Sequence, residues 1–169
     1  MNLGTWRTPL AVFGLLLVAA VLGWGVYSDE RILAGGKVVR LALAPVDPRS
    51  LLQGDYMALN YALAEQLRQA KTREDGYLVL QVDAQRVGHF ARTLPTLADA
   101  ALASDELALR YRVRNGRVQL ATNAFFFQEG HEPRFREARY GEFRVGENGE
   151  PRLVALLDAR FAILGNNRF

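Results

Sequence analysis

The residues able to perform chemistry are few in this chain of 169 residues. There is no cysteine, which excludes a disulfide framework, a thiolate metal site, a cysteine nucleophile and an N-terminal lipid on cysteine. The only histidines are His89 and His131, and the only lysines are Lys37 and Lys71. His131 lies between Glu129 and Glu132, but neighbouring side chains on a strand point to opposite faces, so we expect a solvated turn and no metal site. We expect no cofactor.

Nucleophilic catalysis finds little support in the remaining residues. Neither Ser50 nor Ser104 lies in a Gly-x-Ser-x-Gly turn, as a Ser-His-acid triad of the hydrolase type would require. A serine-lysine dyad needs a buried lysine with a lowered pKa, and neither lysine lies in an apolar context. A convergence of Asp55, Glu129 and Glu137 would suit glycoside hydrolysis, although their spacing does not require it. An envelope hydrolase or glycan-acting enzyme therefore stays as the alternative to a protein without enzymatic activity.

Charge is distributed unevenly along the chain. Arg7 is the only basic residue among the 21 that precedes position 29, and all 18 acidic residues follow Ser28. Beyond that point the two signs are nearly balanced, so the net charge of +3 does not indicate a nucleic-acid partner. The densest basic stretch alternates, with Arg110, Arg112 and Arg114 on one face of an expected strand, which favours a solvated face over a phosphate site.

Residues 9–27 form an uncharged apolar segment, which as a helix spans about 28 Å, close to the hydrocarbon thickness of a bilayer. Trp6 and Trp24 lie near its two ends, where indole rings favour the headgroup region. We therefore predict a retained single-pass membrane anchor, with a cytoplasmic N-terminus and an exported C-terminal domain. The alternative is a signal peptide cleaved near Ser28, although the segment is longer than an ordinary signal core.

We divide the chain into a cytoplasmic tail with its anchor (1–28) and an extracytoplasmic domain (29–169). The pattern predicts a mainly β (α+β) fold of antiparallel strands with one or two short helices. Asn115-Gly116 predicts a tight hairpin, and Asn148-Gly149 predicts a second hairpin. Strands are expected over residues 37–44, 56–61, 77–82, 86–90, 107–113, 117–121, 123–128 (buried), 143–145, 152–156 and 161–164, with a helix over 62–71 and a helix or irregular loop over 132–140.

One segment resembles the signature of a known family. Gly54, Asp55, Tyr56, Leu59 and Tyr61 have the spacing Gly-Asp-Tyr-x-x-Leu-x-Tyr, which is similar to the motif of the GDYXXLXY family of membrane-anchored bacterial proteins. The resemblance extends over about residues 30–160 and includes an aromatic second patch, Phe126-Phe127-Gln128-Glu129-Gly130, with Glu137 at a position where the family often has an acid.

The resemblance implies a single anchor, an extracytoplasmic domain and association with a multi-spanning membrane protein, and it implies no activity. From the residues themselves, Gly54 suits a turn, Asp55 can bond neighbouring amides, and Leu59 shares a strand face with Tyr61. The motif therefore has two interpretations. In one it is a turn that leads into a core strand. In the other Asp55, Tyr56, Tyr61, Glu129 and Glu137 contribute to a binding surface. A ligand-sensing domain is a further hypothesis, weakened by a cytoplasmic tail of about eight residues.

Overall fold

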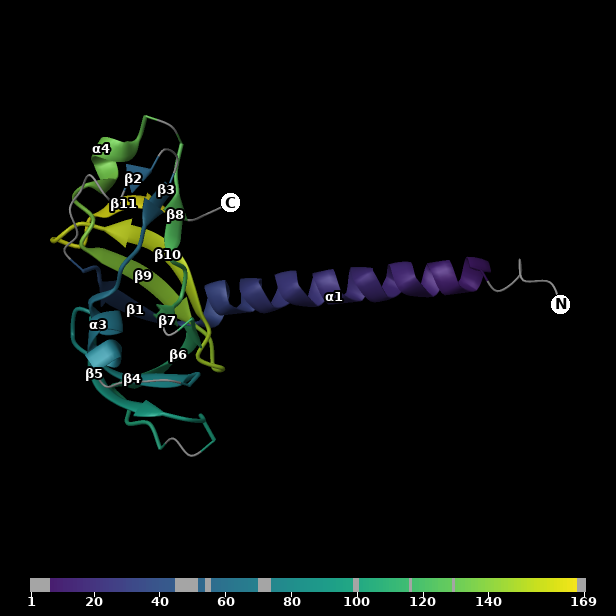
Figure 1. Ribbon diagram of the computed structural model, residues 1–169, viewed down its shortest axis with the longest axis horizontal. Helices are drawn as coiled ribbons and strands as arrows, with labels where there is room; N and C mark the ends of the chain where they lie inside the picture. Colours follow the sequence, from purple (N-terminus) through teal and green to yellow (C-terminus); the bar gives the residue numbers. More distant parts are fainter. Residues whose placement is uncertain are drawn as a thin grey trace.

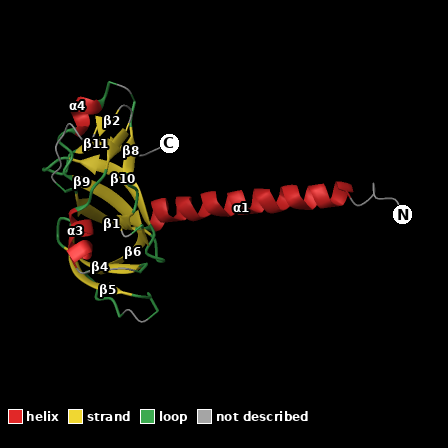
Figure 2. Ribbon diagram, in the orientation of Figure 1, coloured by secondary structure: helices red, strands yellow, loops and turns green. Residues whose placement is uncertain are grey.

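The computed structural model describes residues 7–44, 52–53, 56–69, 74–98, 101–115, 117–128 and 130–166. These residues form an N-terminal helix followed by a domain of antiparallel sheets with two short helices (Figures 1 and 2). The mainly β prediction is confirmed. Gly54, Asp55 and Glu129 from the predicted sites lie outside the described residues, as does Lys71.

Helix α1 (Arg7–Gly35) is a long rod that projects from one side of the domain (Figure 1). Every residue from 9 to 27 is exposed, and the stretch Pro9–Gly35 is long and apolar enough to cross a membrane by length and composition. A signal sequence satisfies the same criterion. The helix continues beyond the apolar segment, through charged residues, into contact with the domain.

The described part of the domain forms three antiparallel sheets. The first has the order β1 (Lys37–Ala42), β9 (Tyr140–Val145), β10 (Pro151–Leu157) and β11 (Ile163–Asn166). The second is β5 (Gly88–Leu94), β4 (Gly76–Val82), β6 (Glu106–Arg114) and β7 (Arg117–Leu120). The third is small and joins β2 (Leu52–Gln53), β3 (Tyr56–Ala58) and β8 (Ala124–Phe126). The short helices are α3 (Ala62–Gln69) and α4 (Glu132–Phe135).

Both predicted hairpins form. β6 pairs with β7 across Asn115, whose φ of 53° lies in the left-handed region that a tight turn requires. β9 pairs with β10 across a turn in which Gly149 has a φ of 78°. A side chain at Gly149 would also approach the ring of Tyr77 at 3.0 Å, so both conformation and space favour glycine there.

Two expectations about strands need correction. The strand predicted over 56–61 ends at Ala58, because Leu59 and Asn60 leave the sheet and Tyr61 forms only an isolated bridge with Leu43. The strand predicted over 123–128 is shorter and is not buried throughout, since Phe126 is 66% exposed whereas Phe125 is 3% exposed. The alternation of a half-covered strand explains this, because adjacent side chains point to opposite faces.

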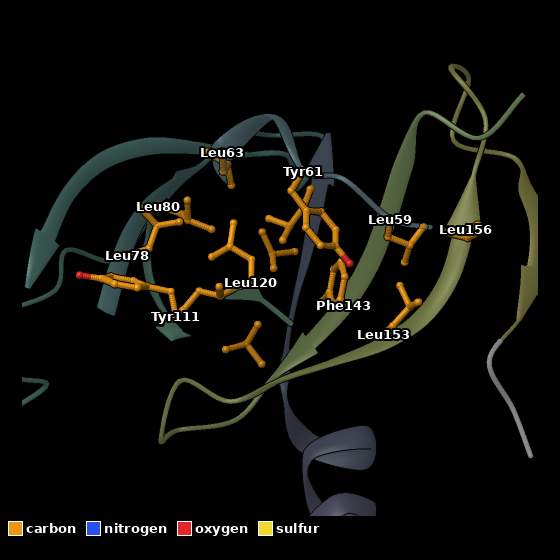
Figure 3. Close-up of a cluster of buried hydrophobic side chains, with 14 of the residues drawn as sticks. Leu59, Tyr61, Leu63, Leu78, Leu80, Tyr111, Leu120, Phe143, Leu153 and Leu156 are labelled. Carbon is orange, nitrogen blue, oxygen red and sulfur yellow. The ribbon is translucent and has the colours of Figure 1, made fainter. Parts of the chain in front are cut away.

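The core lies between the sheets and under α3. Leu63 and Leu67, which stand four residues apart on α3, are both buried against it. Figure 3 shows Tyr61 and Phe143 facing each other at its centre, with their ring centroids 5.8 Å apart. The domain therefore depends on aliphatic and aromatic packing, as the absence of cysteine requires.

Candidate functional site

The two sequence patches of the family resemblance come together in the small sheet. β3 and β8 are paired, with Tyr56 opposite Phe126 and Met57 opposite Phe125. Segments nearly seventy positions apart in the chain are therefore neighbours. No pattern in either segment indicated this pairing, because each strand supplies only three residues. We call the outer face of this pair, marked by Tyr56 and Phe126, the motif surface.

Aromatic contacts hold the second patch in place. The ring of Phe135 on α4 lies 5.2 Å from that of Phe125 and stacks on that of Phe127 at 5.0 Å. The rings of Tyr56 and Phe126 lie 6.0 Å apart. Half-buried Tyr56 and exposed Phe126 thus form the accessible part of this arrangement, and Phe126 carries the most exposed large apolar side chain of the β domain among the described residues.

Tyr61 lies in the core and not on the motif surface. Its side chain is 4% exposed, and its hydroxyl donates a hydrogen bond of 2.6 Å to the carbonyl of Thr122. Burial raises the pKa of Tyr61 well above its usual range. Leu59 is 3% exposed and shares this environment. These two motif positions therefore have a packing role, and Tyr61 ties β1 and the motif segment to the residues that precede β8.

Tyr61→Phe is expected to lower the free energy of unfolding by about 1 kcal/mol, because the carbonyl of Thr122 loses its donor while the ring packing stays. Urea denaturation of the full chain in detergent measures the loss. Tyr140→Phe is the matched control, since the hydroxyl of this half-buried tyrosine makes no hydrogen bond to any residue that the structure describes.

Wild type and the Tyr61→Phe variant give a second measurement at alkaline pH. An unfolded tyrosine ionises near pH 10, whereas buried Tyr61 keeps its proton, so wild type should lose stability as the pH rises above 10. The Tyr61→Phe variant lacks this contribution and should lose less. An equal loss of stability in both proteins above pH 10 would show that the hydroxyl of Tyr61 is not buried.

The predicted acidic site has one described member. Glu137 is exposed and follows α4, while Asp55 and Glu129 lie outside the described residues. His89 is exposed on β5, and its Nε2 lies 3.0 Å from a carboxylate oxygen of Asp83. His131 is also exposed. Within the described residues no group of three or more histidine and acidic side chains gathers in a way that would hold a metal ion.

Two clefts that sequence reasoning missed lie at the base of α1. The larger, of about 690 Å³, is lined by the last turns of α1, by Lys37, by Leu97 and Leu102, and by the beginning of β6. The smaller, of about 510 Å³, is lined by Asp29 and Leu33 of α1 and by residues of β6, β7 and β10. They depend on contacts between α1 and strands more than seventy residues away, which local patterns do not reveal.

Glu106, in the wall of the larger cleft, has an unusually acidic carboxyl group. Both of its oxygens accept hydrogen bonds from the guanidinium of Arg92. One of them also accepts a hydrogen bond of 3.1 Å from the backbone amide of Ala103. These bonds lower the pKa of Glu106 to about 2, with the Arg92 hydrogen bonds as the main cause. The pair links β5 to the start of β6.

Glu106→Gln is expected to make the free energy of unfolding less dependent on pH between pH 4.5 and about 2. Because the folded pKa is depressed from 4.5 to about 2, the ionised form stabilises the fold above pH 4.5, and this contribution is lost as the pH falls toward 2. Urea midpoints across that range should fall more steeply for wild type than for the Glu106→Gln variant. Parallel profiles would contradict the assignment.

The base of α1 is fixed to the domain by several independent contacts. Asp29 accepts hydrogen bonds from Nε and Nη2 of Arg152 at 2.9 and 2.6 Å, and Arg144 donates to the carbonyl of Gly36 at 3.2 Å. Ile32 is 7% exposed, and it would contact any side chain placed at Gly146. The helix and the β domain are therefore joined without a free linker.

Comparison with known proteins agrees with the motif. No curated protein and no solved structure matches the chain significantly. A family model described as GDYXXLXY protein matches residues 18–156, which is most of the chain and includes part of α1, the motif strands and both central hairpins. The chain belongs to the GDYXXLXY family.

Proposed function

We propose that this protein is a single-pass protein of the bacterial inner membrane whose exported β domain binds a multi-spanning membrane protein as a scaffold or binding partner. The observation that carries the proposal is α1. Its exposed apolar part, residues 9–27, is continuous with a helical end that docks onto the β domain. An apolar helix of this length with no covering element needs a lipid environment or a protein partner.

A retained anchor fits the geometry better than a cleaved signal. The residues that resemble a cleavage site, 26–28, lie inside the continuous helix α1. Cleavage there would require local unwinding, and it would separate the membrane segment from Asp29 and Ile32, which pack on the domain. We expect the helix to hold the domain directly at the exported face of the membrane, with the N-terminus in the cytoplasm.

The motif surface is the region that we assign to the partner. Figure 1 places β8, the strand that carries Phe126, on the side of the domain from which α1 leaves. Exposed aromatic side chains contribute strongly to protein interfaces because they bury a large area at a low entropic cost. The family's association with multi-spanning proteins, implied by the resemblance, suggests the partner's class. No observation on the described residues favours the alternative of a hydrolase.

Affinity isolation from detergent-solubilised membranes, with α1 intact, tests this function. We expect one integral membrane protein in a stoichiometric amount with wild type, and at least a tenfold smaller amount with Phe126→Ala, as truncation of a central interface aromatic gives. Ile163→Ala is the matched control, because Ile163 is 56% exposed on β11 of another sheet. Both variants should fold as wild type does. Recovery of no partner with wild type, or equal recovery with Phe126→Ala, would contradict the proposal.

A further inference from the structure

The smaller cleft at the base of α1 brings together three arginines, two from β6 and one from β10. Its walls come from α1, β6, β7 and β10. The two residues of α1 are Asp29 and Leu33, and the cationic residues are Arg110, Arg112 and Arg152. The side chains of these arginines are 40%, 49% and 38% exposed. The cleft therefore offers partly exposed guanidinium groups beside the point where the helix meets the domain.

Positive charge exceeds negative charge in this cleft. Arg110 and Arg112 both donate to the same oxygen of Glu150, at 2.8 and 3.0 Å, and Arg152 lies 3.9 Å from the other oxygen. Arg152 is also paired with Asp29. Three guanidinium groups thus share two carboxylates. Arg110 and Arg112 each use one guanidinium nitrogen to donate to the same oxygen of Glu150. Because a guanidinium group has five N–H donors, each of these arginines keeps donors for a further anion.

The helix places this cleft at a defined depth, and here the inference rests on the membrane anchor proposed above. The apolar segment ends at Tyr27, so Asp29 and Leu33 lie only about 3 and 9 Å beyond it along the helix axis. The polar headgroup layer of a bilayer is about 5–7 Å thick on each side. Because Asp29 is fixed to Arg152, the arginines are held at the level of the lipid phosphates.

The lining of the cleft also suits a lipid. Leu33 is 44% exposed, Ala121 is half-buried, and the buried residues Pro151 and Leu153 complete the apolar part of the lining. A phospholipid at the membrane surface presents a phosphate next to glycerol and acyl carbon, which matches this combination. Arginine binds phosphate through paired N–H groups and is more weakly hydrated than lysine.

We propose that the cleft lined by Arg110, Arg112 and Arg152 binds the phosphate headgroup of an anionic phospholipid in the membrane that α1 crosses. The headgroup would lie against the N–H groups of Arg110 and Arg112 that Glu150 does not occupy. Such a lipid would brace the domain against the membrane and fix its orientation around α1.

Native mass spectrometry of the full-length protein in detergent, with added phosphatidylglycerol or phosphatidylcholine, tests the proposal. Wild type should retain phosphatidylglycerol with an apparent affinity at least tenfold above that for phosphatidylcholine. The double variant Arg110→Gln/Arg112→Gln should lose this preference. Arg117→Gln, which removes a charge from an exposed position on β7 outside the cleft, should keep it. Circular dichroism melting curves establish that all three proteins are folded.

Two outcomes would overturn the lipid assignment: equal binding of the two lipids by wild type, or an undiminished preference in the double variant. Displacement of phosphatidylglycerol by an equal concentration of inorganic phosphate would also overturn it in favour of a soluble phosphate site. Alkaline carbonate extraction of cell membranes separates this failure from that of the anchor. A protein that stays in the membrane without a lipid preference refutes only the headgroup site, whereas release into the soluble fraction refutes the anchor itself.

Discussion

Phe143→Ala is expected to lower the free energy of unfolding by about 3–5 kcal/mol. Phe143 is fully buried on β9, and its ring meets that of Tyr61 edge-on at the centre of the core. Truncation removes contacts and leaves a cavity that the surrounding sheet cannot close, because β9 is fixed between β1 and β10. Domains of this size are stable by about 5–15 kcal/mol, so the loss is a large part of the total.

Urea denaturation of the full chain in detergent, followed by near-ultraviolet circular dichroism, measures this effect. Phe90→Ala is the matched control: Phe90 is 37% exposed on the edge strand β5, and its truncation should cost far less. Equal losses for the two variants would show that Phe143 is not at the centre of the core.

Gly36→Ala is expected to disturb the junction between α1 and the domain. A Cβ at this position would lie 2.5 Å from the carbonyl oxygen of Ile32 and 3.0 Å from that of Val145, and backbone atoms cannot move aside as side chains do. The helix end must therefore shift away from β9. We expect a loss of about 1–3 kcal/mol in the free energy of unfolding, as for other forced contacts in packed regions.

Gly35→Ala is a close control, because a Cβ there meets no atom of the described structure within 4 Å. Since the chain has no cysteine, spin labels can be placed through Leu22→Cys on α1 and Arg117→Cys on β7. The distance between the labels should have a narrow distribution in the wild-type and Gly35→Ala backgrounds and a broad one with Gly36→Ala. A broad distribution in all three would contradict a rigid junction.

Local signals predicted much of the fold. The Asn-Gly pairs indicated both hairpins because their turns need backbone angles that few other residues adopt. The alternating arginines of β6 lie on one partly exposed face, where their partners are Glu150 and Asp75. The apolar run indicated the helix, although not its length. Asp29 and the residues after it remain helical because Arg152, more than a hundred positions away, and the packing of Ile32 hold them there.

The candidate surfaces were less accessible to sequence reasoning. The alternation of sides in the motif placed Leu59 with Tyr61 and opposite Tyr56, but it did not show which side is buried. In the structure Leu59 and Tyr61 are buried and Tyr56 is half-buried, and the alternation continues past the end of the strand at Ala58. The pairing of β3 with β8 and the clefts beside α1 depend on contacts between distant segments. Such contacts leave no periodic trace in either segment.

If α1 is a retained membrane anchor fixed to the β domain, it must still be present in the mature protein. Intact mass measurement of the natively expressed protein, purified from alkaline-washed membranes, tests it most directly. We expect a single species in the membrane fraction that still contains residues 9–27. A mature protein that begins near Asp29 and occurs in the soluble fraction would contradict it.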